Sequence, residues 1–108
     1  MSKVFISMPM HSKSTEQVRA EMQKVFEHIK NKVPEAELID SIFDGADKEI
    51  ALKGNDIGIW YLGKSLQMMA EADFVFFVND YRDYRGCMTE KLVAEKYGKF
   101  CVEIEVNL

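Results

Sequence analysis

The chain has 108 residues, of which 47% are hydrophobic and 30% charged, and its formal net charge is −4. This length suits one compact domain that buries roughly two thirds of the surface of its unfolded chain. The acidic balance provides no broad basic field, which argues against nucleic acid as the main partner. No apolar run approaches the roughly 20 residues that cross a bilayer, so no membrane partner is expected.

The two cysteines, Cys87 and Cys101, indicate a reducing compartment. No charged-then-apolar signal segment is present, so both thiols are expected to be reduced, in a cytoplasmic protein. Neither cysteine has metal-ligand spacing to the two histidines. The sequence therefore indicates no metal and no other cofactor.

The first half of the chain predicts a strand, a helix and a second strand. Residues 3–7 (KVFIS) are rich in β-formers and precede Pro9, which fixes the loop that follows. A helix is predicted from Ser14 or Thr15, as the N-cap, to the residue before Pro34, because its apolar residues recur at helical spacing. These apolar residues are Val18, Met22, Val25, Phe26 and Ile29. Residues 36–42 (AELIDSI) predict the second strand.

The second half predicts two more helices and two more strands. Residues 43–56 contain Asp-Gly and Gly-Asn pairs and predict an exposed connection. A helix is predicted over 57–72, and the short apolar run at 73–79 (DFVFFVN) predicts a strand buried on both faces. The last helix is predicted to have Gly86 or Cys87 as its N-cap and Gly98 at its C-terminal end, before a final strand at 99–106.

Strands that alternate with helices predict an α/β fold. We expect a single three-layer α/β/α domain with a small, mostly parallel sheet, flavodoxin-like or Rossmann-like. Ligands of such sheets bind outside the carboxyl ends of the strands. Two loops meet this condition, residues 7–14 (SMPMHSKS) and residues 79–86 (NDYRDYRG), and they would line one crevice if their strands are neighbours.

Glu90 has two interpretations at the start of the last helix. With Gly86 or Cys87 as N-cap it lies at the third or fourth helical position, where the helix dipole favours an ionised carboxylate. It is then either a carboxylate that satisfies free backbone donors or a nucleophile that attacks an anomeric carbon. Cys87 at the same helix end is a weaker candidate nucleophile, because no histidine is close to it in sequence.

The loop before Glu90 carries residue types that bind nucleotides. Tyrosine stacks on bases and arginine holds phosphate, so Tyr81, Arg82, Tyr84 and Arg85 are either ligand contacts or an ordinary exposed loop. Asn79 and Asp80 follow the buried strand and would reach ribose hydroxyls, although the same pair also favours a turn. In the first loop, His11 is interpreted as a solvated residue.

Three segments together resemble the nucleoside 2-deoxyribosyltransferase family, which is related to the 2'-deoxynucleoside 5'-phosphate N-hydrolases. They are "KVFISMPM", "YLGKSLQMMAEADFVFFV" and "RGCMTEKLVAEKYGKF". The most specific feature is the order of Gly86, Glu90, Ala94 and Gly98-Lys99 after the buried strand. The resemblance covers most of the chain except residues 42–56, and it implies a single deoxyribosyltransferase-like domain over residues 1–108.

The resemblance implies that Glu90 is the nucleophile that displaces the base from a nucleoside or nucleotide. Ser65 stands where relatives carry an aspartate that assists the leaving base, and Asp83 is the candidate acidic helper. Phe5 stands in the place of a tyrosine that contacts substrate, Met8 in that of a glycine, and Tyr84 in that of an acidic residue or serine. The expected substrate contacts are Phe5, Ser7, Met8, Pro9, Ser65, Asn79, Asp80, Tyr84, Arg85 and Gly86.

Three functions stay open at this point. The first is an enzyme that transfers or hydrolyses the N-glycosidic bond, and the second is a non-catalytic module that binds a nucleotide in the same crevice. The third is an accessory protein with a vestigial crevice. The resemblance also implies a homo-oligomer, for which Trp60 and Tyr61 are candidate anchors unless they pack within the chain.

Overall fold

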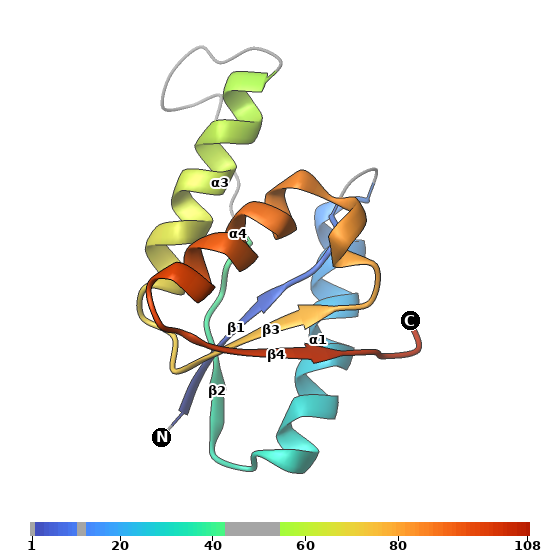
Figure 1. Cartoon of the computed structure of the whole chain (residues 1–108). Helices are drawn as coiled ribbons and strands as arrows, with labels where there is room; N and C mark the ends of the chain where they lie inside the picture. The colour runs from blue at the N-terminus through green and yellow to red at the C-terminus, as the bar shows by residue number, and fades with distance from the viewer. Residues whose placement is uncertain (1, 11–12, 43–54) are drawn as a thin grey trace.

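A computed structural model describes residues 2–10, 13–42 and 55–108 of the chain (Figure 1). Its sheet contains four strands, which are β1 (Ser2–Ser7), β2 (Ala36–Leu38), β3 (Phe74–Val78) and β4 (Phe100–Ile104). They lie in the order β2-β1-β3-β4, and every neighbouring pair is parallel. The predicted α/β class is confirmed, and this order is the flavodoxin-like one without a fifth strand.

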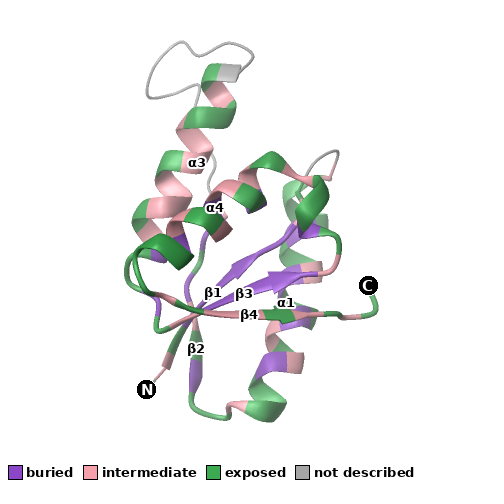
Figure 2. Cartoon of the chain, in the orientation of Figure 1, coloured by how far each residue is buried: buried purple, intermediate pink, exposed green. Residues whose placement is uncertain are grey.

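Helices cover both faces of the sheet. Helix α1 (Thr15–Lys32) packs on one face through Met22, Val25 and Ile29, against Val4, Ile6 and Phe76 among other strand residues. Helices α3 (Asn55–Met69) and α4 (Arg85–Lys96) cover the other face. Successive strand residues point to opposite faces, so Phe5 and Ser7 of β1 face α3 and α4. Figure 2 shows the resulting buried layer along β1 and β3.

Local signals explain where the helices begin and end. Ser14 is the N-cap of α1, and its side chain accepts a hydrogen bond from Gln17 N at 3.1 Å. Gly98 has a φ of 73°, which favours glycine. The N–H groups of Gly98 and Lys99 bond to the carbonyls of Glu95 and Ala94, which is a Schellman motif. The predicted glycine at the end of α4 is confirmed.

Several predicted boundaries were wrong by a few residues. The strand predicted at 36–42 ends at Leu38, because Asp40 Oδ1 accepts the Ile42 N–H at 3.1 Å and turns the chain. The buried strand and the final strand are shorter than predicted, at 74–78 and 100–104. The helix predicted over 57–72 runs from Asn55 to Met69. Most of the predicted connection 43–56 and all of His11 lie outside the described residues.

The start of α4 corrects a more important prediction. Its N-cap is Tyr84, in an extended conformation (φ −123°, ψ 121°), and not Gly86 or Cys87. The short 3-10 helix η1 (Tyr81–Asp83) leads directly into it. Glu90 is therefore the sixth residue of α4, beyond the first turn in which backbone donors lack partners. The helix-capping interpretation of Glu90 was wrong.

Candidate functional site

The fold brings the two predicted loops to one place. β1 and β3 are hydrogen-bonded neighbours, with Ser7 opposite Phe77, and the connections leave β1 and β3 in opposite directions. The point where the strand order reverses is where open α/β sheets bind their ligands. Ser7 lies at this end of β1, and Asn79 and Asp80 follow directly after β3.

A buried carboxylate lies at this end of the sheet. Ser7 Oγ donates a hydrogen bond to Glu90 Oε1 at 2.7 Å, which joins the end of β1 to the middle of α4. Glu90 is only 7% exposed, and Ser7 is fully buried. A hydrogen bond to a carboxylate in such a setting is stronger than one in water, because little solvent competes for it.

Burial dominates the acid–base behaviour of Glu90. Loss of hydration raises the pKa of Glu90 from 4.5 to about 7, and the hydrogen bond from Ser7 opposes part of this rise. The helix end was expected to favour the ionised form of Glu90, but its influence falls off within the first turn. The carboxyl group is thus poised to change charge near neutral pH, where an acid, base or nucleophile is most useful.

Cys87 lies beside this pair and has no sign of activation. Burial raises the pKa of the Cys87 thiol to about 11; contact with Ser7 opposes this rise and the negative charge of Glu90 adds to it. A thiol in this state is protonated at neutral pH and is a poor nucleophile. The structure therefore opposes the alternative in which Cys87 attacks a substrate.

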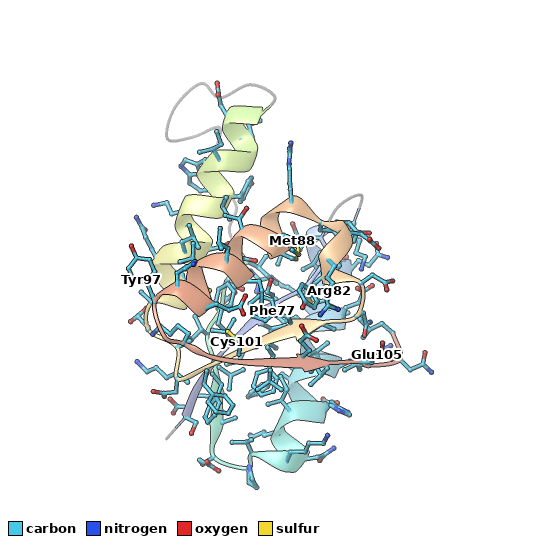
Figure 3. All side chains as sticks on the ribbon, in the orientation of Figure 1. Phe77, Arg82, Met88, Tyr97, Cys101 and Glu105 are labelled. Carbon is cyan, nitrogen blue, oxygen red and sulfur yellow. The ribbon has the colours of Figure 1, made fainter. Side chains whose placement is uncertain are left out.

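The tyrosine and arginine side chains of the loop divide into two groups. Tyr81 is 2% exposed, and its hydroxyl donates a hydrogen bond to Glu103 on β4. Arg82 stacks on the Tyr81 ring and donates to Glu103 Oε1 at 2.7 Å. Figure 3 shows Arg82 on the segment between β3 and α4. Tyr81 fits neither of its two interpretations, a ligand contact or an exposed loop residue, because its ring belongs to the core.

Tyr84 and Arg85 remain accessible from outside. Tyr84 is half-buried against the core below α4, and Arg85 is exposed. Arg85 reaches towards α3, since a Cβ at Gly58 would lie 3.7 Å from its Nη2. A Cβ at Gly86 would meet no atom within 4 Å, which leaves open space at the start of α4.

The structure does not bring all of the predicted contacts to Glu90. Met8 is buried in the core that faces α1, and Phe5 is buried in the core below α4. The Asn79 amide holds the chain near the C-terminus: its Nδ2 donates to Val106 O at 3.0 Å, and its Oδ1 accepts from Val106 N at 2.8 Å. The predicted ribose contact of Asn79 would have to displace these bonds.

The remaining candidates have no described contact to Glu90. Pro9 is half-buried, and Asp80 and Asp83 are exposed on the loop and η1. Ser65 is half-buried on α3, and helical spacing places it on the same side as Met69, which is buried in the core below α4.

Glu103 and Lys91 were missed by sequence reasoning. Lys91 Nζ donates to Glu103 Oε1 at 3.0 Å and to the Tyr81 hydroxyl at 3.1 Å. Hydrogen bonds, chiefly from Tyr81 and then from Lys91, lower the pKa of Glu103 to about 2. Both residues stand at unremarkable positions of a helix and a strand, so no sequence signal connects them with the loop.

A hollow of about 250 Å³ lies elsewhere, between β2 and the end of α3. Its lining residues are Lys3, Glu37, Leu38, Ile39, Asp40, Met68 and Glu71. None of the residues predicted for the site belongs to this set.

No protein-family model, curated protein or solved structure matches the chain. Among residues 2–10, 13–42 and 55–108, no three His, Cys, Asp or Glu side chains are grouped so that they could hold a metal ion. No helix in the same part of the chain has the length and apolar character required to cross a membrane.

Proposed function

We propose that the protein breaks the N-glycosidic bond of a nucleoside or nucleotide, by deoxyribosyl transfer or hydrolysis, with Glu90 as the nucleophile. The observation that carries this proposal is the buried Ser7–Glu90 pair at the point where the strand order reverses. A carboxylate held there by a buried donor has a fixed direction of attack, which is the main requirement of a nucleophile.

The proposed reaction has two steps. An ionised oxygen of Glu90 forms a bond with C1' of the sugar while the C1'–N bond breaks, and the base leaves with the electron pair and takes up a proton. Water or a second base then attacks C1' and releases the Glu90 carboxylate. Asp83 is the proposed proton donor to the leaving base, because it is the carboxyl group on η1 beside the crevice.

Ser7 acts as a positioning residue in this scheme. Its hydroxyl stabilises the ionised form of Glu90 and holds one carboxylate oxygen, which leaves the other oxygen for attack. Arg85 and Tyr84 are the proposed contacts for a 5'-phosphate and a base, since both are accessible beside the open space at Gly86. We also propose a cytoplasmic location, which suits two free thiols, and a homo-oligomeric assembly.

Release of free base tests the enzyme proposal. The protein is incubated with a panel of nucleosides and their 5'-monophosphates, and free base is measured by chromatography. We expect release by the wild type, none by Glu90→Gln, and normal release by Glu95→Gln, an exposed position on the same helix. Intact-mass analysis of quenched reactions should show one added sugar group on the wild type alone. No release from any member of the panel would refute the proposal.

A nucleotide-binding module without catalysis is the second candidate. It is favoured by the pKa of about 7 for Glu90, because a carboxyl group that is partly protonated at neutral pH can donate a hydrogen bond to a bound ligand. Glutamine is also a donor, so Glu90→Gln should keep ligand binding in this case. A nucleotide that raises the melting temperature of both wild type and Glu90→Gln, with no base released by either, would establish the module.

A further inference from the structure

The hollow of about 250 Å³ between β2 and the end of α3 combines charged groups of both signs with an apolar patch. Its charged side chains belong to Lys3, Glu37, Asp40 and Glu71, and its apolar ones to Leu38, Ile39 and Met68. β2 is an outer strand of the sheet (Figure 1), and Lys3, Glu37 and Glu71 are exposed. A small molecule can therefore reach these groups from solvent.

The register of the sheet places Lys3 and Glu37 next to each other. The two residues are direct partners in the pairing of β1 with β2. Two residues further along each strand, Phe5 and Ile39 belong to the core below α4. Side chains alternate along a strand, so Lys3 and Glu37 point to this same face of the sheet. A basic and an acidic side chain thus stand side by side on the wall of the hollow.

These neighbouring charges do not neutralise one another. In the part of the chain that the structure describes, no ion pair joins Lys3 to Glu37 or Glu71. None of these three side chains has a hydrogen-bond partner within that part either. Asp40 differs, because its carboxylate already forms an ion pair with Arg19 at 3.4 Å. Among the described residues, the hollow therefore offers one ammonium group and two carboxylates that are open to a ligand.

We propose that this hollow binds a free aliphatic α-amino acid in its zwitterionic form. The carboxylate of the ligand contacts Lys3, its ammonium group faces Glu37 and Glu71, and its side chain covers Ile39 and Met68. Charge complementarity selects this ligand class. A ligand with a cation alone would lie beside the like charge of Lys3, and one with an anion alone would lie beside two carboxylates.

The size and floor of the hollow restrict the ligand further. Pockets for drug-sized molecules usually measure about 300–1,000 Å³, so a hollow of about 250 Å³ suits a smaller molecule. Ile39 is 8% exposed, and Met68 packs against the core below α4, so the apolar patch is held in place by the fold. A residue inside a peptide chain has neither a free ammonium group nor a free carboxylate, which favours a free amino acid over a peptide segment.

Nuclear magnetic resonance of the isotope-labelled protein tests this site with L-leucine as the probe. Added up to about 20 mM, it should shift the amide signals of residues 3, 37–40 and 68–71 with a Kd on the order of 1 mM. N-acetyl-L-leucine lacks the cation and L-leucinamide lacks the anion, so each should bind at least ~5-fold more weakly. Free glycine lacks the apolar side chain and should also bind more weakly than L-leucine.

Variants show which charge meets which end of the probe. Lys3→Gln should weaken L-leucine at least ~5-fold and should not weaken L-leucinamide, which has no carboxylate to bind. Glu37→Gln combined with Glu71→Gln should weaken L-leucine and should not weaken N-acetyl-L-leucine, which has no ammonium group. Lys24→Gln, at an exposed position of α1 on the other face of the sheet, is the charge control and should bind as the wild type does.

Three results would overturn this assignment. The first is the lack of saturable shifts at these residues with L-leucine up to about 20 mM. The second is equal binding of L-leucine and its two analogues, and the third is equal weakening of L-leucine and L-leucinamide by Lys3→Gln. The titration measures amino-acid binding and not base release, so it can fail independently of the proposed activity.

Discussion

Replacing Glu90 with glutamine should make the protein more stable above neutral pH. A carboxyl group whose pKa is raised by folding stabilises the fold while it is protonated. Its contribution is complete below pH 4.5 and is lost as the pH rises through about 7. Glutamine has nearly the same shape, accepts the same hydrogen bond from Ser7 and carries no charge at any pH.

The size of the effect follows from the two pKa values of Glu90. A change from 4.5 to about 7 corresponds to about 3 kcal/mol of unfolding free energy between pH 4 and pH 8. We expect the wild type and Glu90→Gln to agree within about 1 kcal/mol near pH 4. Near pH 8 the variant should be more stable by about 3 kcal/mol, or roughly 10 °C or more in melting temperature for a domain of this size.

Urea unfolding followed by far-ultraviolet circular dichroism measures this difference at each pH. The protein concentration is kept low and constant, so that association does not contribute to the free energy of unfolding. Subtracting the unfolding free energy of the wild type from that of Glu90→Gln at each pH removes the effect of other groups. Glu103 is one of them: its pKa is lowered in the folded protein, so its contribution to stability is lost as the pH falls towards about 2. Glu95→Gln is the matched control and should follow the wild type. A difference that is constant with pH, or that favours the wild type at pH 8, would refute the assignment of Glu90 as a buried titrating group.

Four further outcomes are expected. Ser7→Ala removes the hydrogen bond that opposes the rise in the pKa of Glu90, so the loss of stability that begins near pH 4.5 should extend to higher pH, and an unchanged upper limit would contradict this. Gly86→Ala should fold normally or gain up to ~1 kcal/mol, because its Cβ meets open space. Gly98→Ala should lose about 1 kcal/mol or more in chemical unfolding, because of its φ of 73°; similar effects at both glycines would be evidence against this account. Glu103→Gln should speed tryptic cleavage in the 80–85 loop while the melting temperature changes little. Equal cleavage rates for the variant and the wild type would show that the carboxylate does not hold the loop.

The fold was largely predictable because its signals are local. The apolar spacing in α1, the apolar run of β3 and the glycine that ends α4 each determine an element without reference to distant residues. Alternation of strands and helices then predicts a parallel sheet. The ends of β2 and β4 were less predictable, because side-chain bonds to the backbone decide where those strands stop.

The site was less predictable because its decisive contacts join distant parts of the chain. Ser7 and Glu90 are 83 positions apart, and their hydrogen bond determines how the carboxylate behaves. Tyr81 looked like a ligand contact because tyrosine next to arginine is common in nucleotide sites. Its hydroxyl instead bonds to Glu103, 22 positions later, which no local pattern reveals. The start of α4 was placed too late because Tyr84 is not a usual N-cap residue.

The contacts of the 80–85 loop also constrain the order in which the chain folds during synthesis. The loop depends on Glu103, and Asn79 depends on Val106, 27 positions downstream. A ribosome makes the strands and helices first and delivers these two residues late. A nascent chain that ends before residue 103 already contains β1, β2 and β3 but lacks the partners of the 80–85 loop and of Asn79. Premature termination near this point would yield a product in which the 80–85 loop lacks Glu103 and Asn79 lacks its backbone partner.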